Sequence, residues 1–201
     1  MNLEELKKSY ETKKDLINQR LDEFKKEKND DELFAELAFC LLTPQSKAKL
    51  CWLSIENLKI KGLLYSHSKA IRPWITTVRF CDNKSRYIEE AQKKFPSVKE
   101  VLKKEPEQAR EWLVKHIKGY GYKEASHFLR NIGILNFAIL DRHILKNLKK
   151  YGVIKEIPKS LTPKKYKEIE KQMKEFSAVV GISLAELDLL FWSQETGEVF
   201  K

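Results

Sequence analysis

Two side chains in the middle of this 201-residue chain have the types and spacing for covalent chemistry. Lys123 lies two positions after the hinge Gly119-Tyr120-Gly121, and Asp141 follows eighteen positions later. A neutral lysine amine is a nucleophile. A carboxylate facing it can stabilise positive charge that grows on a sugar carbon as a leaving group departs. The pair therefore predicts nucleophilic catalysis through an amine.

Each of these features also has a purely structural interpretation. Two glycines around one residue can simply join two helices, and a lysine in so lysine-rich a chain is usually solvated. Asp141 stands where a helix N-cap belongs, which is worth about 1 kcal/mol. Lys123 is less ordinary, because a cation in the first turn of a helix meets the positive end of the macrodipole. That placement favours the neutral amine, and the two roles of Asp141 are compatible.

The charge of the chain points to a polyanionic partner. The net charge is +10, with 39 Lys and Arg against 29 Asp and Glu, and the pI is near 9.3. A basic surface attracts phosphates and releases counterions on binding. Free N–H groups of the helix that follows Gly121 would form an anion site for a DNA phosphate. Abundant Lys and Glu are also typical of heat-stable surfaces, so charge alone leaves both interpretations open.

Several classes of protein are disfavoured. Three cysteines without a CxxC spacing indicate free thiols in a reducing compartment, and they do not fit zinc or iron–sulfur ligation. The chain has no 18-residue apolar run, and the first fifteen residues lack the apolar core of a signal peptide. We expect a cytoplasmic protein without a membrane partner.

The elements that must position these residues are helices throughout. Helical spacing over 2–28 predicts an amphipathic helix broken once, and the apolar run 31–42 predicts a buried helix ended by Pro44. A helix is expected to begin near Gln45 or Ser46 and to stop at Gly62, and Ser97 begins a capping-box pattern after a helix over 83–95. Further helices are expected over 68–76, 106–117, 122–131, 142–150, 162–180 and 183–194. We predict an all-α fold of ten to twelve helices, with the termini and the middle forming two lobes and a cleft between them.

At the hinge the residues carry a family resemblance. Residues 113–143 resemble the helix–hairpin–helix motif of the endonuclease III superfamily of DNA glycosylases, in which a lysine follows a Gly-x-Gly hairpin and an apolar segment leads to an aspartate. The resemblance implies one helix–hairpin–helix glycosylase domain over 1–201, with the motif at about 107–131 and the catalytic aspartate at 141. Lys118 stands where the motif commonly has proline.

The resemblance extends over nearly the whole chain. The segment 41–47 is similar to the one that inserts a polar side chain into the gap left by a flipped base, with Gln45 as the wedge, and 78–88 is similar to a segment near the cleft. The ending 189–201 resembles the compact type-2 8-oxoguanine DNA glycosylase/lyases, which implies base recognition by Trp192 and Lys201. Phe80, in the segment 78–88, is a further candidate for base recognition. Candidate DNA contacts, each of which could instead face solvent or serve the fold, are Gln45, Lys47, Lys84, Arg86, Gly119, Gly121, Arg142 and His143.

The function implied is excision of 8-oxoguanine from duplex DNA through a Schiff base on Lys123, followed by a β-elimination nick at the abasic site. The expected partner is double-stranded DNA with 8-oxoguanine or abasic sites, bound by a monomer. No cofactor is expected to be required, although hairpin carbonyls are a candidate holder of a structural Na⁺ or K⁺. Two rivals stay open: another damaged base on the same scaffold, and a non-catalytic helix–hairpin–helix DNA-binding module.

Overall fold

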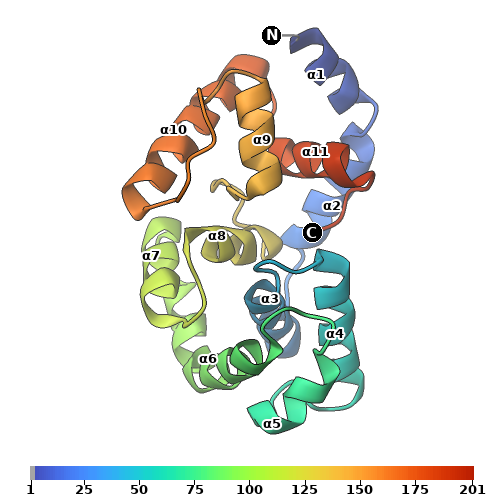
Figure 1. Cartoon of the computed structure of the whole chain (residues 1–201), viewed down its shortest axis with the longest axis vertical. Coiled ribbons are helices and arrows are strands. Elements are labelled where there is room, and N and C mark those ends of the chain that lie inside the picture. Colours follow the sequence, from blue (N-terminus) through green and yellow to red (C-terminus); the bar gives the residue numbers. More distant parts are fainter. Residues whose placement is uncertain (1–2) are drawn as a thin grey trace. The chain divides into compact units, whose positions relative to one another are not determined.

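The computed structural model describes residues 3–201, and Asn2, where the predicted N-terminal helix begins, lies outside the described residues. The described chain is helical, with no strand in residues 3–201 (Figure 1). The elements are α1 (Leu3–Glu11), α2 (Lys14–Lys25), α3 (Asp30–Leu42), α4 (Ala48–Ile60), α5 (Ser68–Ile71), the 3₁₀ helix η1 (Arg72–Trp74), α6 (Cys81–Val101), α7 (Pro106–His116), α8 (Tyr122–Asn131), α9 (Arg142–Lys150), α10 (Pro163–Val180) and α11 (Leu184–Thr196). The all-α prediction is confirmed.

Local signals in the sequence set most helix ends. The Thr162 hydroxyl accepts from Lys165 N at the start of α10, and Ser183 and Glu186 form the predicted capping box of α11. The predicted break in the N-terminal helix is also present, between Glu11 and Lys14. These ends follow from side chains within four residues of the terminus, which is why sequence patterns find them.

Two expected helix starts are wrong. Ser97 begins no helix, because α6 runs without a break from Cys81 to Val101 through Pro96. A proline inside a helix costs about 3 kcal/mol. One face of α6 nevertheless buries Ile88, Phe95 and Val98, on both sides of that proline, and this burial offsets the cost. Likewise α4 begins at Ala48 and not near Gln45, because Gln45 has a left-handed backbone with φ 55°.

Contacts divide the chain into two compact units, and α8 passes from one to the other. The middle unit comprises Glu27–Phe128. Its core is α3, which is buried from Phe34 to Leu42 and packs against α4 and α6 (Figure 1). Asn29 and Glu32 close the start of α3 with a capping box.

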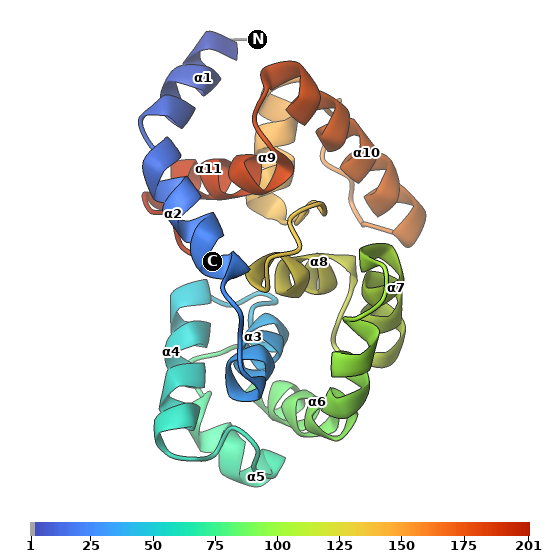
Figure 2. The same ribbon diagram turned by 180° about the vertical axis from the view of Figure 1, so that it is seen from behind.

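The second unit joins the described residues up to Lys26 to Leu129–Lys201. Here α11 lies between α2 and α9 (Figure 2). A buried ion pair between Arg130 and Asp188, 2.9 Å apart, links α8 to α11. The connector before Asp141 is fixed from α10, because Ala138 N donates to Glu170 and Leu140 N donates to the Tyr166 hydroxyl. The division into termini and middle matches the two predicted lobes, and the cleft between them stays a prediction.

Among residues 3–201, no single helix is long and apolar enough to cross a membrane; only α10 and α11, a bent pair, reach that length and composition when they are counted together.

Candidate active site

The hinge before Lys123 has a conformation that requires glycine. Gly119 has φ 92°, and a Cβ there would lie 2.7 Å from Cδ2 of Tyr87. A larger residue would therefore meet both backbone strain and a ring of α6. Between the glycines, Tyr120 is buried and its hydroxyl donates to Leu37 O over 2.8 Å. These contacts fix the hinge against α3 and α6.

The start of α8 already has an anionic partner. The Glu124 carboxylate accepts from Gly121 N at 3.0 Å, as the third residue of a capping box does. A DNA phosphate at the hinge would therefore have to use other N–H groups or displace this carboxylate. Binding of a phosphate by Gly119 and Gly121 stays a prediction.

Lys123 is half-buried, with 23% of its side chain exposed. Its ammonium lies 3.2 Å from the Thr43 hydroxyl and 3.7 Å from a Glu124 carboxylate oxygen. Thr43 gives its own proton to Cys40 O, so its oxygen accepts from the lysine. The amine is thus held at one point and still reaches solvent, as a nucleophile requires.

The loop that follows α3 carries both Thr43 and the predicted wedge. Gln45 is exposed in the left-handed conformation, with φ 55°. Lys47, the residue before α4, is exposed too. The structure thus presents Gln45 and Lys47 on the surface of the middle unit, and their contact with DNA stays a prediction.

The position of Lys84 differs from the one expected of a residue that binds a DNA phosphate. Only 4% of it is exposed, and its ammonium donates to Leu42 O at 2.7 Å, Pro44 O at 2.7 Å and the Ser46 hydroxyl at 3.1 Å. All three ammonium protons are therefore used inside the protein. The pKa of Lys84 is lowered to about 8, mainly by desolvation and in smaller part by the nearby Lys123 ammonium. Lys84 holds a loop and does not face a phosphate in this structure.

The segment 78–88 contains a second exposed residue of interest. Phe80 is 53% exposed and adopts φ 61° immediately before α6. The Arg79 guanidinium lies over its ring, 5.3 Å from the centroid. Arg86 is exposed and donates to Asp82 O and to Asn83, so it lies along its own helix. Phe80 and Arg86 thus lie at the surface of the middle unit, and their contact with DNA stays a prediction.

Asp141 performs the predicted N-cap role in the other unit. Its Oδ1 accepts from His143 N at 2.8 Å and from Ile144 N at 2.9 Å. Within residues 3–201 both hydrogen bonds of this carboxylate end on Oδ1, which leaves Oδ2 for another group. A fixed carboxylate with one free oxygen suits both predicted roles. Lys123 belongs to the middle unit, and its approach to Asp141 stays a prediction.

The residues after Asp141 connect it to the end of the chain. Arg142 is exposed, and its Nε donates to the His143 ring over 3.3 Å. Glu195, in the last turn of α11, lies 3.8 Å from the His143 ring and 2.7 Å from the Lys146 ammonium. These charges lower the pKa of Glu195, with the Lys146 hydrogen bond as the largest cause. α9 is therefore tied to the beginning of the tail.

The tail returns onto α11. Gly197 ends that helix with φ 87°, and Val199 is buried. The rings of Trp192 and Phe200 lie 6.2 Å apart, and Trp192 and Lys201 are both partly exposed. The structure places the two predicted reader residues Trp192 and Lys201 at one end of the second unit. Phe80 belongs to the middle unit.

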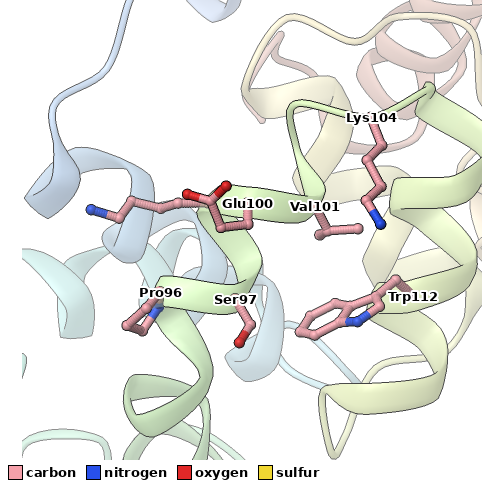
Figure 3. Close-up of a pocket in the computed structure, with 7 residues that line it drawn as sticks. Pro96, Ser97, Glu100, Val101, Lys104 and Trp112 are labelled. Carbon is pink, nitrogen blue, oxygen red and sulfur yellow. The ribbon is translucent and has the colours of Figure 1, made fainter.

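Sequence reasoning missed Thr43, Glu124 and the buried role of Lys84. Glu124 had a detectable signal, because a Glu three residues after Gly121 completes a capping pattern. Thr43 and Lys84 act over long sequence separations and had none. The hollow of Figure 3, lined by residues such as Pro96, Lys104 and Trp112, contains none of the predicted site residues. Across residues 3–201, no group of three or more His, Cys, Asp or Glu is arranged to hold a metal.

Known proteins resemble this chain over nearly its full length. Residues 17–182 match the model of a family described as 8-oxoguanine DNA glycosylase. An 8-oxoguanine DNA glycosylase/AP lyase of Fusobacterium nucleatum is 44% identical over 98% of this chain and 96% of its own. The crystal structure of the Thermotoga maritima 8-oxoguanine DNA glycosylase is 35% identical, with a TM-score of 0.89 over 99% of this chain and 98% of that one.

A third relative was solved with its substrate. The Methanocaldococcus jannaschii 8-oxoguanine glycosylase/lyase, in complex with a 15mer DNA containing 8-oxoguanine, is 38% identical. It matches with a TM-score of 0.89 and covers 98% of this chain and 99% of that chain. These likenesses confirm the predicted fold and the resemblance read from the sequence.

Proposed function

This chain belongs to the 8-oxoguanine DNA glycosylase/AP lyase family, and on that premise we propose that Lys123 is its catalytic nucleophile and Asp141 the carboxylate that supports the reaction. The protein is a bifunctional enzyme of base-excision repair. It takes 8-oxoguanine out of duplex DNA and cleaves the strand at the abasic site that results. Extrusion costs a few kcal/mol of stacking and pairing, which contacts to the DNA must offset.

The chemistry needs only an amine and a carboxylate. The neutral Lys123 nitrogen forms a bond to C1′, and the glycosidic bond breaks with its electron pair leaving on the base. Asp141 stabilises the positive charge that grows on the sugar. The proton that the Lys123 nitrogen loses is transferred to the departing base. The sugar ring opens as its oxygen O4′ takes up a proton, which leaves a Schiff base between Lys123 and C1′. A base such as the Asp141 carboxylate then removes a C2′ proton, and the bond from C3′ to its oxygen breaks with the electron pair leaving on the phosphate. The strand is nicked 3′ to the lesion.

The observation that carries this assignment is the environment of Lys123. The amine stands at the first turn of α8, and it is fixed by the Thr43 hydroxyl at 3.2 Å. Thr43 lies two residues before the exposed Gln45, in the same loop. A single loop thus orients the nucleophile through Thr43 and presents the wedge through Gln45, as expected if extrusion and attack occur at one place.

Substrate selection is assigned to residues outside the hinge. We propose that Trp192, Lys201 and Phe80 recognise the oxidised base. The exposure of Phe80 and the folding of the tail onto α11 support this assignment. Duplex DNA would be held by Gln45, Lys47, Arg86, Arg142, His143 and the hinge glycines, because phosphate contacts position a protein on DNA without reading its sequence.

The enzyme acts as a monomer in the cytoplasm, on duplexes with 8-oxoguanine or abasic sites. A lysine nucleophile requires neither a redox cofactor nor a catalytic metal. Hairpin carbonyls around Gly119 are the candidate site for a structural Na⁺ or K⁺. Dialysis against chelators would test whether activity needs a catalytic metal. Exchange of Na⁺ for a bulky organic cation would test the structural cation at the hairpin.

Borohydride trapping tests the proposed function directly. Wild-type enzyme and Lys123→Gln are incubated with an 8-oxoguanine duplex and reductant, and Lys115→Gln on α7 is the control. We expect a covalent complex for wild type and Lys115→Gln, and none for Lys123→Gln. Peptide mapping of the complex should place the sugar adduct on Lys123. A complex that persists in Lys123→Gln would move the nucleophile elsewhere, and release of oxidised pyrimidines but not 8-oxoguanine would overturn the assigned substrate.

A further inference from the structure

Two exposed residues have backbone conformations that L-residues rarely adopt. Gln45 has φ 55° and Phe80 has φ 61°, and they are the only non-glycine residues with positive φ among those that the structure describes. Such a conformation costs on the order of 1–3 kcal/mol and persists only where the surroundings impose it. Both residues were predicted to contact the DNA. The question is what imposes the strain.

The loop around Gln45 is closed by a turn hydrogen bond from Ser46 N to Thr43 O at 3.0 Å, and one buried ammonium braces it from below. Lys84 donates to Leu42 O and Pro44 O on one side of Gln45 and to the Ser46 hydroxyl on the other. Two carbonyls before Gln45 and one side-chain hydroxyl after it therefore converge on a single nitrogen. Free rotation at Gln45 would break at least one of these hydrogen bonds.

The Lys84 ammonium is also connected, through Ser46, to the turn that carries Phe80. The Ser46 hydroxyl, which accepts from Lys84, also accepts from Arg79 N at 3.1 Å. The main-chain N–H of Lys84 also donates to Phe80 O at 3.0 Å, a backbone hydrogen bond in which the ammonium takes no part. The loop 43–46 and the turn 79–80 are thereby joined through Ser46 and Lys84, although more than thirty residues separate them in the chain.

A buried ammonium at this position carries a large desolvation cost. Taking the charge out of water costs several kcal/mol, and an apolar side chain of the same volume is often more stabilising. Desolvation is the main cause of the lowered pKa of Lys84. An ammonium does supply three donors in a compact group, which no apolar residue can. The carbonyls and the hydroxyl around Gln45 need such a group.

We infer that Lys84 is a positioning residue for base extrusion, because its ammonium holds Gln45 and Phe80 in their strained and exposed conformations before DNA binds. The inference rests on the proposed function, in which these two residues contact the opened duplex. A loop ordered in advance loses less conformational entropy when it enters the DNA. Lys84 itself touches neither DNA nor the reacting atoms.

The test separates extrusion from chemistry. Lys84→Met keeps the length of the side chain and removes the ammonium, and Lys93→Met, an exposed lysine of the same helix, is the matched control. Each variant is assayed for single-turnover excision from an 8-oxoguanine duplex, and for borohydride trapping on a single-stranded abasic oligonucleotide, which needs no extrusion. Fluorescence of 2-aminopurine beside the lesion reports the opening of the duplex.

We expect Lys84→Met to excise about 10- to 100-fold more slowly, the range seen when a supporting group is misplaced. Its 2-aminopurine signal should be weaker, its trapping on the single strand should stay within about twofold of wild type, and Lys93→Met should match wild type in all three assays. Equal losses of excision and trapping would show a merely structural role and overturn the inference, as would unchanged excision. Absence of trapping by the wild type would instead overturn the proposed function.

A milder variant covers the case in which Lys84→Met fails to fold. Ser46→Ala removes the hydroxyl that joins Lys84 to Arg79 N, and Ser66→Ala is the control in a neighbouring turn. Loss of one such hydrogen bond is worth about 1 kcal/mol, or roughly fivefold. Ser46→Ala should therefore show a loss of excision of about that size with unchanged trapping. If both activities of Ser46→Ala equal those of Ser66→Ala, the inference is wrong.

Discussion

The ammonium of Lys123 donates to the hydroxyl of Thr43 at 3.2 Å across a sequence separation of 80 residues. Thr43 is buried and is itself anchored to Cys40 O in the last turns of α3. The proposed nucleophile is therefore held by the core helix of the middle unit and not by its own helix alone. The structure thus fixes the position of the Lys123 ammonium through Thr43, the residue that follows α3.

Thr43→Val should show how much this alignment contributes. Valine has the same shape without the hydroxyl, so the lysine loses its partner while packing is kept. We expect the rate of borohydride trapping to fall about tenfold, since hydrogen bonds to charged groups are worth about 1.5–3 kcal/mol. Thr12→Val is the control, because the Thr12 hydroxyl likewise donates to a carbonyl three residues earlier, on an exposed helix end. Unchanged trapping in Thr43→Val would show that Lys123 needs no such support.

Asp141→Asn separates the cap from the catalyst. The amide oxygen of asparagine can still accept from His143 N and Ile144 N, and Asn caps helices about as well as Asp. The free energy of unfolding should therefore change by less than about 0.5 kcal/mol. Excision should fall by about 10²–10⁴, the usual loss of an acid–base group. Asp141→Ala, which also loses the cap, should be destabilised by about 1 kcal/mol. Survival of activity in Asp141→Asn would leave Asp141 as a cap alone.

Gln45→Gly and Gln45→Ala should differ in stability and agree in activity. Glycine adopts φ 55° without strain, so Gln45→Gly should be more stable than Gln45→Ala by about 0.5–1 kcal/mol, after its larger loss of backbone entropy. Both variants lack the wedge and should open a lesion duplex poorly in the 2-aminopurine assay. Chemical denaturation measures the first difference. Full activity in Gln45→Ala would remove the wedge role.

Removal of Lys201 should affect recognition of the base more than the lyase step. The tail is held to α11 by the burial of Val199 and by the contact of Phe200 with Trp192, so the last residue has a defined place. We expect excision of 8-oxoguanine to fall about tenfold, the worth of one charge-assisted hydrogen bond. Cleavage of a preformed abasic site should stay near wild type, and Lys149→Ala serves as the charge control. Equal loss in both assays would contradict a role in reading the base.

Lys84 should give the stability of the protein a measurable pH dependence. Its pKa is lowered from 10.5 to about 8 in the folded state, chiefly by desolvation, with Cys51 and Glu124 opposing and Lys123 and Arg79 reinforcing the shift. Between these values the unfolded chain binds more protons, so stability rises with pH. The stability gained when Lys84 is deprotonated is complete above pH 10.5 and is lost as the pH falls through about 8. Urea titrations of wild type and Lys84→Met from pH 7 to 10 should show a steeper rise for wild type, and parallel curves would contradict the shift.

The chemistry of this protein could be read from short-range patterns. The hinge, the cap at Asp141 and the capping box at Ser183 depend on residues within a few positions of one another, and the structure confirms the cap and the box. The continuous α6 could not be read in this way. Its proline and its Ser97 pattern both signal an end, and burial of Phe95 and Val98 overrides them.

The sequence by itself determined the reaction class and the helical fold, and it singled out Lys123 and Asp141 as the proposed catalytic pair. Only the tertiary structure decided how the supporting residues are used. Lys84 looked like one basic surface residue among many, and the fold places it beneath the loop of Gln45. Thr43 looked like a helix end, and the fold brings it to Lys123. The physical reason is that hydrogen bonds between residues 40 to 80 positions apart leave no period and no motif in the chain, because only the packing of α3 against α6 and the hinge brings their atoms together.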